Sequence, residues 1–599
     1  MNETKKGSRG ILWRVLFFLT GCLFLAVLEL GKFTAAGWVL AAAVLAGFYL
    51  LRRNVLKEAS AARRLLSWLG LAAALGLVLW ISYPPVRRVP AVSGRDPRKT
   101  GIVTVAQGHL RGVYTPDGAV EVYAGIPYAE PPVGDLRWKE PQPKAPWEGI
   151  LEADHFAPMS MQTQNGPLYS SLAQIIGYHD YEIRPDDDYR PPASEDSLYL
   201  NIWKPAGDVS GLPVLVYVHG GSLQTGQPWY ADYSGEGLAR LGAVVVNMGY
   251  RLGIFGFFAD EALAAESPNH TTGNYGLLDQ IQALRWVKEN IAAFGGDPDN
   301  VTLAGESAGA ASVSALCTSP LAKGLFRRAV LESSTVASPE PPHSFRLWEE
   351  AVRSGNELKA RYQARSLAEF RALPADNLVG EADTQHHMTI DGYALTELPY
   401  ESYRAGRYNG EALLHGFNRE ESAPFIIFAH ARLKNYEKRV RSSFGEYADE
   451  VLALFPASTD EEADRNWADI FSAAYFTYSH YCLTRLAAAN GLPVYEYFFT
   501  KENGRLGTWH SGEEVYLYGN IPADSRLYGA RDYALSDQMR GYFVNFIRTG
   551  DPNGGDLPRW EKSTDGRMLL ELGEEVRPAE DPFLKLYGIL DKMQGFGQD

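Results

Sequence analysis

Three long apolar runs dominate the first ninety residues. Residues 11–30 are apolar apart from Arg14 and Glu29, residues 33–51 contain no charged residue, and neither do residues 65–86. Each run has about the length that a helix needs to cross a hydrocarbon core, whereas a cleaved signal peptide has one shorter run. We therefore expect a membrane segment, residues 1–98, with three transmembrane helices at about 11–30, 33–51 and 65–86 and a linker. The alternative is three buried helices of a soluble domain.

Beyond residue 98 the hydrophobic pattern changes to short apolar runs that alternate with helical patterns. Residues 102–122 alternate apolar and polar positions around a Pro-Asp-Gly turn signal at 116–118, which predicts a hairpin. The apolar runs 213–218 and 243–247 predict buried strands. Strands that alternate with helices are typical of a central, mostly parallel sheet, so residues 99–599 are expected to form one α/β domain.

One stretch, residues 301–310, combines a buried strand, a Gly305-x-Ser307-x-Gly309 motif and a helix of small residues. Strand, sharp turn and helix form the context that exposes a serine oxygen at the top of an α/β-hydrolase sheet. The two glycines let neighbouring backbone pass close to a strained turn. The alternative is a Gly/Ala-rich helix start with an incidental serine.

Charge is distributed unevenly. Residues 1–90 carry 12 Lys and Arg against 3 Asp and Glu, whereas the rest of the chain carries 45 against 69. An acidic body argues against nucleic acid as a partner. The three cysteines, Cys22, Cys317 and Cys482, are too few for a disulfide framework and do not form a metal-binding motif.

Further motifs surround the serine stretch along nearly the whole body. With them the chain resembles the type-B carboxylesterase family of α/β hydrolases, which includes the cholinesterases and the bacterial para-nitrobenzyl esterases. The resemblance implies a serine esterase that acts on small-molecule esters and needs no cofactor and no metal. The matching segments are 124–138, 194–203, 219–222, 273–280, 294–298, 305–310, 535–537 and 549–554.

The resemblance assigns the nucleophile and the base. Hydrolases of this fold carry their catalytic residues in the chain order Ser, Asp or Glu, His. Ser307 is the expected nucleophile, and His510 is the expected base because the segment 509–520 is similar to the family's catalytic-histidine loop. The remaining late histidines lack such a context and are expected to be surface or packing residues: His386, His387, His415, His430 and His480.

The acid of the triad is expected at Glu421. The segment 413–422 resembles the family's strand end Gly-x-x-x-Asp/Glu-Glu-Gly, and counting from Gly416 puts the acid at Glu421 and an accompanying carboxylate at Glu420. The family's next residue is glycine, whereas this chain has Ser422. Glutamate suffices for the role, since the carboxylate only fixes the imidazole tautomer and stabilises its cation.

The oxyanion hole is expected to use the backbone N–H groups of Gly221, Ser222 and Ala308. The family has a third glycine at the position of Ser222. The same resemblance gives His219 the role of holding the loop through a hydrogen bond. It gives Glu306, beside the nucleophile, an electrostatic or structural role.

Two serines stand where many secreted members of the family have a disulfide. The segments 158–162 and 195–198 carry Ser160 and Ser197 in place of the paired cysteines. The bridge is therefore absent, the intervening loop must be held in another way, and the chain looks more like the bacterial branch.

Basic residues around the apolar runs set the expected orientation. Lys and Arg precede the first run and fill the second loop, whereas the first loop has only Lys32. The positive-inside rule then places the N-terminus and the second loop in the cytoplasm, so that three spans put the body on the far side. We expect a multi-pass protein of the cell membrane with an extracytoplasmic catalytic domain. Arg87 and Arg88, after the third run, are a mild counter-signal.

The combined hypothesis is a membrane-anchored serine esterase with the triad Ser307, Glu421 and His510. The rival hypothesis is a catalytically silent, cholinesterase-like adhesion or binding protein, although such proteins have lost triad residues that this chain retains. The particular ester, the oligomeric state and any further role of the helices are open. Loops such as 162–192 and 386–394 are expected to shape the acyl and alcohol pockets.

Overall fold

The computed structural model describes most of the 599 residues. The described chain comprises residues 2–57, 59–84, 92, 97–163, 168, 172, 192–341, 345–384, 386–426, 429–502, 508–523 and 527–597, with side chains from residue 13 onward and none at 382–384. Most of the expected linker and of the loop 162–192 lies outside these residues. The chain divides into two compact units, Met1–Arg88 with Gln164–Pro192, and Val89–Thr163 with Ala193–Asp599.

The described part of the first unit contains three long apolar helices, α1 (Asn2–Leu30), α2 (Ala35–Leu50) and α3 (Ala61–Ser82), with a π-helical segment η1 (Leu51–Val55) after α2. Each helix is long and apolar enough to cross a membrane. The runs are thus helical as expected, although the third helix begins at Ala61 and ends at Ser82 rather than spanning 65–86. Arg63 and Arg64 therefore lie within a helix rather than in a loop.

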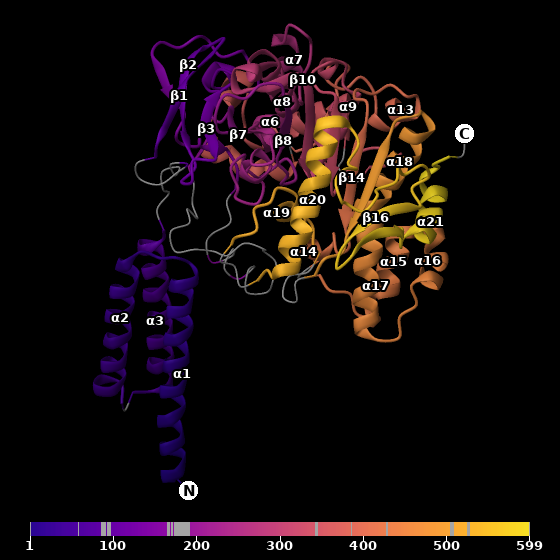
Figure 1. Ribbon diagram of the computed structural model, residues 1–599. Coiled ribbons are helices and arrows are strands. Elements are labelled where there is room, and N and C mark those ends of the chain that lie inside the picture. Colours follow the sequence, from indigo (N-terminus) through magenta and orange to yellow (C-terminus); the bar gives the residue numbers. More distant parts are fainter. Residues whose placement is uncertain are drawn as a thin grey trace. The chain divides into compact units, whose positions relative to one another are not determined.

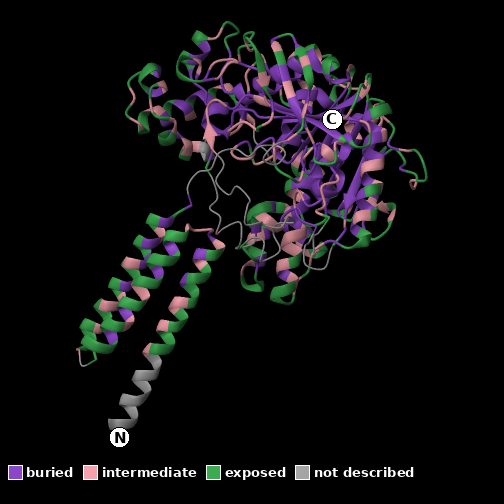
Figure 2. Ribbon diagram, turned by 60° about the vertical axis from the view of Figure 1, so that its left-hand side comes forward, coloured by how far each residue is buried: buried purple, intermediate pink, exposed green. Residues whose placement is uncertain are grey.

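A small apolar core joins these helices, while most of their apolar side chains face outward. Phe24, Ala41 and Leu71 are among the buried residues, whereas Phe18, Val39 and Trp80 are 68%, 70% and 77% exposed. Figure 2 shows the exposed class along the outer faces of all three helices. Outward-facing apolar side chains are what a lipid environment solvates and water does not.

The second unit is built on a 13-stranded sheet of the described residues (Figure 1). The sheet is parallel from β9 through β16 and antiparallel near both edges, so the expected α/β class with a mostly parallel sheet is confirmed. In spatial order its strands are β1 (Lys99–Val105), β2 (Gly108–Tyr114), β3 (Val120–Pro127), β7 (Tyr199–Pro205), β9 (Val244–Met248), β8 (Leu212–Val218), β10 (Gly296–Glu306), β11 (Arg328–Glu332), β14 (Leu413–Asn418), β15 (Val494–Phe499), β16 (Met568–Leu572) and β17 (Val576–Glu580), with β4 (Ile150–Glu152) beside β2.

The expected hairpin is confirmed around the Pro-Asp-Gly turn, where β2 and β3 pair antiparallel, but the part of the chain before the turn forms two strands instead of one. The chain forms three antiparallel strands there, because a second tight turn between β1 and β2 at residues 106–107 adds a strand. The turn is Ala-Gln-Gly, in which only Gly108 signals a break, and its φ of +150° is accessible to glycine. Two short parallel pairs stand apart from the main sheet: β5 (Met159–Ser160) with β6 (Ala193–Ser194), and β12 (Phe345–Leu347) with β13 (Met388–Ile390).

Helices cover both faces of the sheet. The described helices of this unit are α5 (Glu236–Ala239), α6 (Gly253–Phe257), α7 (Glu261–Glu266), α8 (Tyr275–Asn290), α9 (Ala308–Thr318), α10 (Trp348–Arg361), α11 (Leu367–Arg371), α12 (Ala375–Leu378), α13 (Pro399–Arg404), α14 (Ala423–Ile426), α15 (Leu433–Phe444), α16 (Ala448–Leu454), α17 (Asp460–Ser472), a π-helical segment η7 (Ala473–Thr477), α18 (Tyr478–Ala489), α19 (Glu514–Leu517), α20 (Ala530–Thr549) and α21 (Leu584–Gln594).

The central strands bury side chains on both faces, as strands of a parallel sheet do. On β8, Val214, Val216 and Val218 join a core with α8 and α9, whereas Leu215 and Tyr217 join a second core with α5, α19 and α20. Figure 1 shows α20 lying along the sheet. This double coverage explains why the strand sequences read as continuous apolar runs rather than as alternating ones.

The carboxyl ends of four parallel strands bring the sequence-predicted site residues to one edge of the sheet. β8 leads into His219–Ser222, β10 into Ser307, β14 into Glu421, and β15 into the segment that carries His510. Because parallel strands all end at the same edge, residues 200 positions apart in sequence become neighbours.

Candidate active site

Ser307 occupies the turn between β10 and α9 with φ 53° and ψ −125°. A positive φ is costly for a residue with a side chain, so such a residue persists only where its surroundings hold it. Its N–H donates to the carbonyl of Glu332 at the end of β11, and its carbonyl accepts from Ala311 in α9. The turn is thus tied to a neighbouring strand and to its own helix, and it presents a side chain that is 6% exposed.

The two glycines of the motif allow this turn to pack. A Cβ on Gly305 would lie 2.6 Å from the carbonyl carbon of Gly309, and one on Gly309 would collide with the carbonyl oxygen of Val218. These contacts are with backbone, which cannot turn aside as a flexible side chain would. Close backbone approach, expected from the motif, therefore accounts for both glycines.

The predicted oxyanion loop follows β8. Gly221 has φ 104° and Ser222 has φ 57°, so both lie in the left-handed half of backbone space. Within the described chain neither N–H donates to a protein acceptor, and the N–H of Ala308, the first residue of α9, has no acceptor inside the helix. His219 is buried, its Nδ1 lies 2.9 Å from the Gly220 carbonyl, and burial lowers its pKa to about 4.

Glu421 and His510 are in direct contact. The Nδ1 atom of His510 lies 2.5 Å from Oε2 of Glu421, whose other oxygen accepts a 2.7 Å hydrogen bond from the N–H of Asn418 at the end of β14. The carboxylate is fully buried. It is therefore oriented by the strand end and can fix the tautomer of the imidazole.

Glu420 points elsewhere. Its Oε2 accepts from the N–H of Thr508 at 3.0 Å and lies 3.3 Å from the Thr508 hydroxyl, and its backbone pairs with Trp509. Glu421 thus contacts the imidazole, whereas Glu420 holds the segment that precedes His510.

His510 lies between two carboxylates. Its Nε2 is 3.3 Å from Oε1 of Glu306, which also accepts a 2.6 Å hydrogen bond from the hydroxyl of Ser511. Burial alone would lower the pKa of His510, but the charges of Glu306 and Glu421 outweigh it and raise the pKa to about 9. Burial also raises the pKa of Glu306.

Ser307 and His510 do not form a hydrogen bond in the described chain. The Nε2 atom of His510 is buried without a hydrogen-bond partner there, and its nearest charged neighbour is Glu306. Phe425 and Phe476 contact the imidazole, with ring centroids 5.4 and 4.8 Å away. A hydrogen bond between Ser307 and His510 therefore requires a small shift of the serine or of the imidazole.

A cavity of about 280 Å³ opens at Ser307. Its volume approaches that of ordinary small-molecule pockets. It is lined by Ser222, Leu223, Gln224, Ser307, Ala308, Ala311, His386, His387, Met388, Phe425, Phe471 and Tyr475. The structure thus brings Ser307, Ser222 and Ala308 around one cavity, with Phe425 shared between the cavity and His510.

His386 and His387 line this cavity, as expected for the loop 386–394, although neither was singled out as a site residue from the sequence. They precede β13, whose parallel pairing with β12 fixes their position, a long-range contact that no local pattern announces. The other three histidines behave as expected. His415 and His480 are buried against each other, and His430 is exposed and lies 2.7 Å from Asp464.

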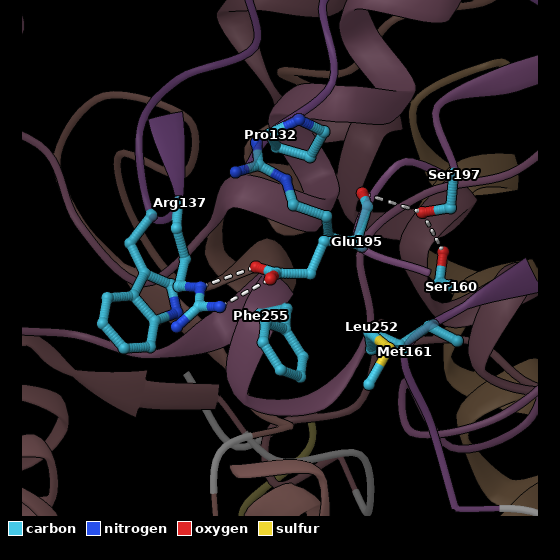
Figure 3. A pocket seen from close by; sticks show the side chains of 10 residues that line it. Pro132, Arg137, Ser160, Met161, Glu195, Ser197, Leu252 and Phe255 are labelled. Atoms are coloured by element: carbon cyan, nitrogen blue, oxygen red, sulfur yellow. Dashed lines mark hydrogen bonds and ion pairs between the residues drawn. The ribbon is translucent and has the colours of Figure 1, made fainter. Parts of the chain in front are cut away.

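Hydrogen bonds replace the missing disulfide (Figure 3). The hydroxyl oxygens of Ser160 and Ser197 lie 2.9 Å apart, and Ser160 Oγ lies 2.6 Å from the carbonyl of Tyr250. One arrangement satisfies both contacts, with Ser197 donating to Ser160 and Ser160 donating to the carbonyl. The adjoining ion pair of Arg137 with Glu195 is also nearly buried, and Figure 3 shows it beside the two serines.

Comparison with known proteins shows the family of the chain. Residues 99–582 match the model of the carboxylesterase family. Fumonisin B1 esterase of Sphingopyxis macrogoltabida is 32% identical over 527 residues, covering 84% of this chain and 92% of that protein. Carboxylesterase 1C of Rattus norvegicus is 30% identical over 521 residues, covering 81% and 92%.

A solved structure is similar in fold as well. The crystal structure of a carboxylesterase from Geobacillus stearothermophilus has a TM-score of 0.68 and 31% identity, covering 82% of this chain and 100% of that one. The chain therefore belongs to the carboxylesterase family, and it is a carboxylic ester hydrolase.

Proposed function

We propose that this protein is a membrane-anchored serine esterase that works through an acyl-enzyme. The observation that carries the proposal is the 2.5 Å contact of Glu421 with His510, next to the strained turn of Ser307. Residues 1–98 form the membrane segment in this proposal, and residues 99–599 form the catalytic domain. The substrate is a small-molecule ester whose carbonyl carbon sits in the cavity at Ser307.

The proposed chemistry has two halves. Ser307 Oγ attacks the ester carbonyl while Nε2 of His510 takes its proton, and the oxyanion accepts hydrogen bonds from the N–H groups of Gly221, Ser222 and Ala308. The imidazolium then protonates the departing alcohol. Water, activated by the same Nε2, cleaves the acyl-enzyme and restores Ser307. Glu421 stabilises the imidazolium throughout without becoming protonated.

Covalent labelling of Ser307 tests the proposal. The purified full chain in detergent should bind a fluorophosphonate at Ser307, as read by mass spectrometry of the labelled peptide. Triad members act as a unit, so Ser307→Ala or His510→Ala should each lower kcat on a small activated ester by several orders of magnitude. Near-normal turnover in either folded variant contradicts the proposed site, and absent labelling together with absent turnover favours the silent binding protein.

The two adjacent glutamates provide a matched pair. Glu421→Gln should lower kcat by on the order of 10⁴, because an amide presents the imidazole with the wrong partner for its tautomer. Glu420→Gln should stay within roughly tenfold, because the amide oxygen still accepts from Thr508. Kinetics of both variants with the same ester decide the matter, and equal or reversed losses would mean that Glu421 is not the acid.

The pH profile tests the role of Glu306. The base must be neutral to act, so kcat/KM of the unmodified enzyme should rise with pH through an apparent pKa of about 9. Glu306→Gln removes a negative charge that stabilises the imidazolium, so the proton leaves more easily and the rise should move about one unit or more to lower pH. The measurement uses an uncharged ester, with Glu420→Gln as the control. An unmoved profile in Glu306→Gln would exclude this electrostatic role.

The topology is a further proposal, with the catalytic domain outside the cytoplasm. Its support is the odd number of apolar helices in the described chain and the excess of Lys and Arg over residues 1–10 and 52–64, before the first and third apolar runs. Protease added to intact spheroplasts should therefore digest the catalytic domain, whereas a cytoplasmic marker stays protected. Digestion only after lysis contradicts this orientation.

A further inference from the structure

A row of aromatic side chains runs from the cavity along one helix. Trp467, Phe471 and Tyr475 recur every four residues on α17 and η7, so they lie on one face. The ring centroids of Phe471 and Tyr475 are 5.2 Å apart and nearly parallel, and those of Trp467 and Phe471 are 6.4 Å apart. Over eight residues of helix the row extends roughly 12 Å.

In the π-helical segment η7 the consecutive aromatic residues Tyr475 and Phe476 point to different surroundings. Tyr475 is 39% exposed and lines the cavity, whereas Phe476 is 1% exposed and contacts His510. π-Helical turns are rare and recur at functional sites, because the widened turn redirects neighbouring side chains. Here the turn keeps the aromatic row continuous up to the cavity while Phe476 supports the imidazole.

The wall of the cavity is suited to an apolar group. Its described lining residues include Phe425, Phe471, Tyr475 and Met388 and contain no Lys, Arg, Asp or Glu. Phe425 is 48% exposed and Tyr475 is 39% exposed, so two large aromatic side chains at this wall contact solvent. Adjacent exposed aromatic surface next to a reactive serine indicates a binding surface rather than a packing accident.

At the end of the row away from the cavity, the guanidinium of Arg439 lies over the ring of Trp467. The guanidinium carbon of Arg439 lies 5.5 Å from the ring centre of Trp467, and its Nη1 donates to the carbonyl of Ala429 at 2.7 Å. An apolar group laid along the row would leave the hydrophobic surface at this point. The apolar surface of the row therefore ends at Trp467.

We propose that Phe425, Phe471 and Tyr475 form a subsite for an extended hydrocarbon chain of the ester, and that Trp467 receives the distal end of a long chain. The proposal rests on the proposed function, because the chain is the acyl part of the ester whose carbonyl meets Ser307. The row is held against that site by Ser422, whose N–H donates to Ser472 Oγ at 3.0 Å and whose hydroxyl donates to the Ala468 carbonyl at 3.0 Å. The turn that carries Glu421 thus also fixes α17.

The test is the chain-length profile of the full protein in detergent. kcat/KM is measured for para-nitrophenyl acetate, butyrate, octanoate and decanoate at one detergent concentration, so that partition into micelles cancels between variants. For the unmodified enzyme, kcat/KM should rise by roughly threefold to fourfold for each methylene that leaves water. Phe471→Ala and Tyr475→Ala should lower the octanoate-to-acetate ratio by roughly tenfold or more, because each removes an aromatic wall.

Further variants test which part of the hydrocarbon chain each aromatic side chain contacts. Tyr475→Phe should keep the ratio, since the ring remains. Trp467→Ala should lower the decanoate-to-octanoate ratio and spare the butyrate-to-acetate ratio. Leu454→Ala, a similarly exposed apolar residue on α16 that does not line the cavity, should leave the whole profile unchanged.

A flat profile in the unmodified enzyme overturns the subsite, as do Phe471→Ala and Tyr475→Ala profiles that fall equally for all four esters. These failures differ from failure of the proposed function. In the first case the acetate is still hydrolysed and Ser307 is still labelled, whereas in the second neither occurs.

Discussion

The backbone at Ser307 is the constraint on which the rest of the site depends. Its positive φ is held because α9 packs so closely on β8 and β10 that only glycine fits at 305 and 309. Such a turn costs about 1–3 kcal/mol of backbone strain, and the packing of the surrounding sheet must offset this cost. The double-sided core of the central strands does so, and the same parallel strands deliver the oxyanion loop, Glu421 and His510 to the same edge.

Around this turn the electrostatics favour a charged imidazole. Three buried carboxylates, those of Glu306, Glu421 and Glu513, act on His510 and raise its pKa, although burial opposes the shift. A buried cation between carboxylates is stable only when hydrogen bonds complete the arrangement. The N–H of Asn418 and the hydroxyl of Ser511 do so for Glu421 and Glu306. Such an environment favours the imidazolium form of His510, which is the form that the proposed mechanism needs after proton transfer.

The alternation of strands and helices allowed the fold class to be predicted, and the family resemblance of the segments 413–422 and 509–520 allowed Glu421 and His510 to be paired. The sequence did not reveal the third strand near the amino end of the sheet, since a two-residue turn followed by a single glycine resembles ordinary alternation. It indicated the loop 386–394 as part of the pocket but not His386 and His387 themselves, whose position depends on the pairing of β13 with β12, more than forty residues earlier. The aromatic row was missed for another reason. Its spacing of four is that of any amphipathic helix, and only the cavity distinguishes it from core packing.

Serine replaces the family's glycine at Ser222 and Ser422, and the two positions show different consequences. Ser422 gains hydrogen bonds to α17 through both its N–H and its hydroxyl, so the replacement couples the turn of Glu421 to the aromatic row. Ser222 lies at φ 57°, where a side chain costs about 1–2 kcal/mol, and its hydroxyl makes no hydrogen bond within the described chain. Ser222 also lines the cavity. Ser222 therefore carries backbone strain that no hydrogen bond within the described chain offsets, whereas Ser422 gains two hydrogen bonds that tie neighbouring elements together.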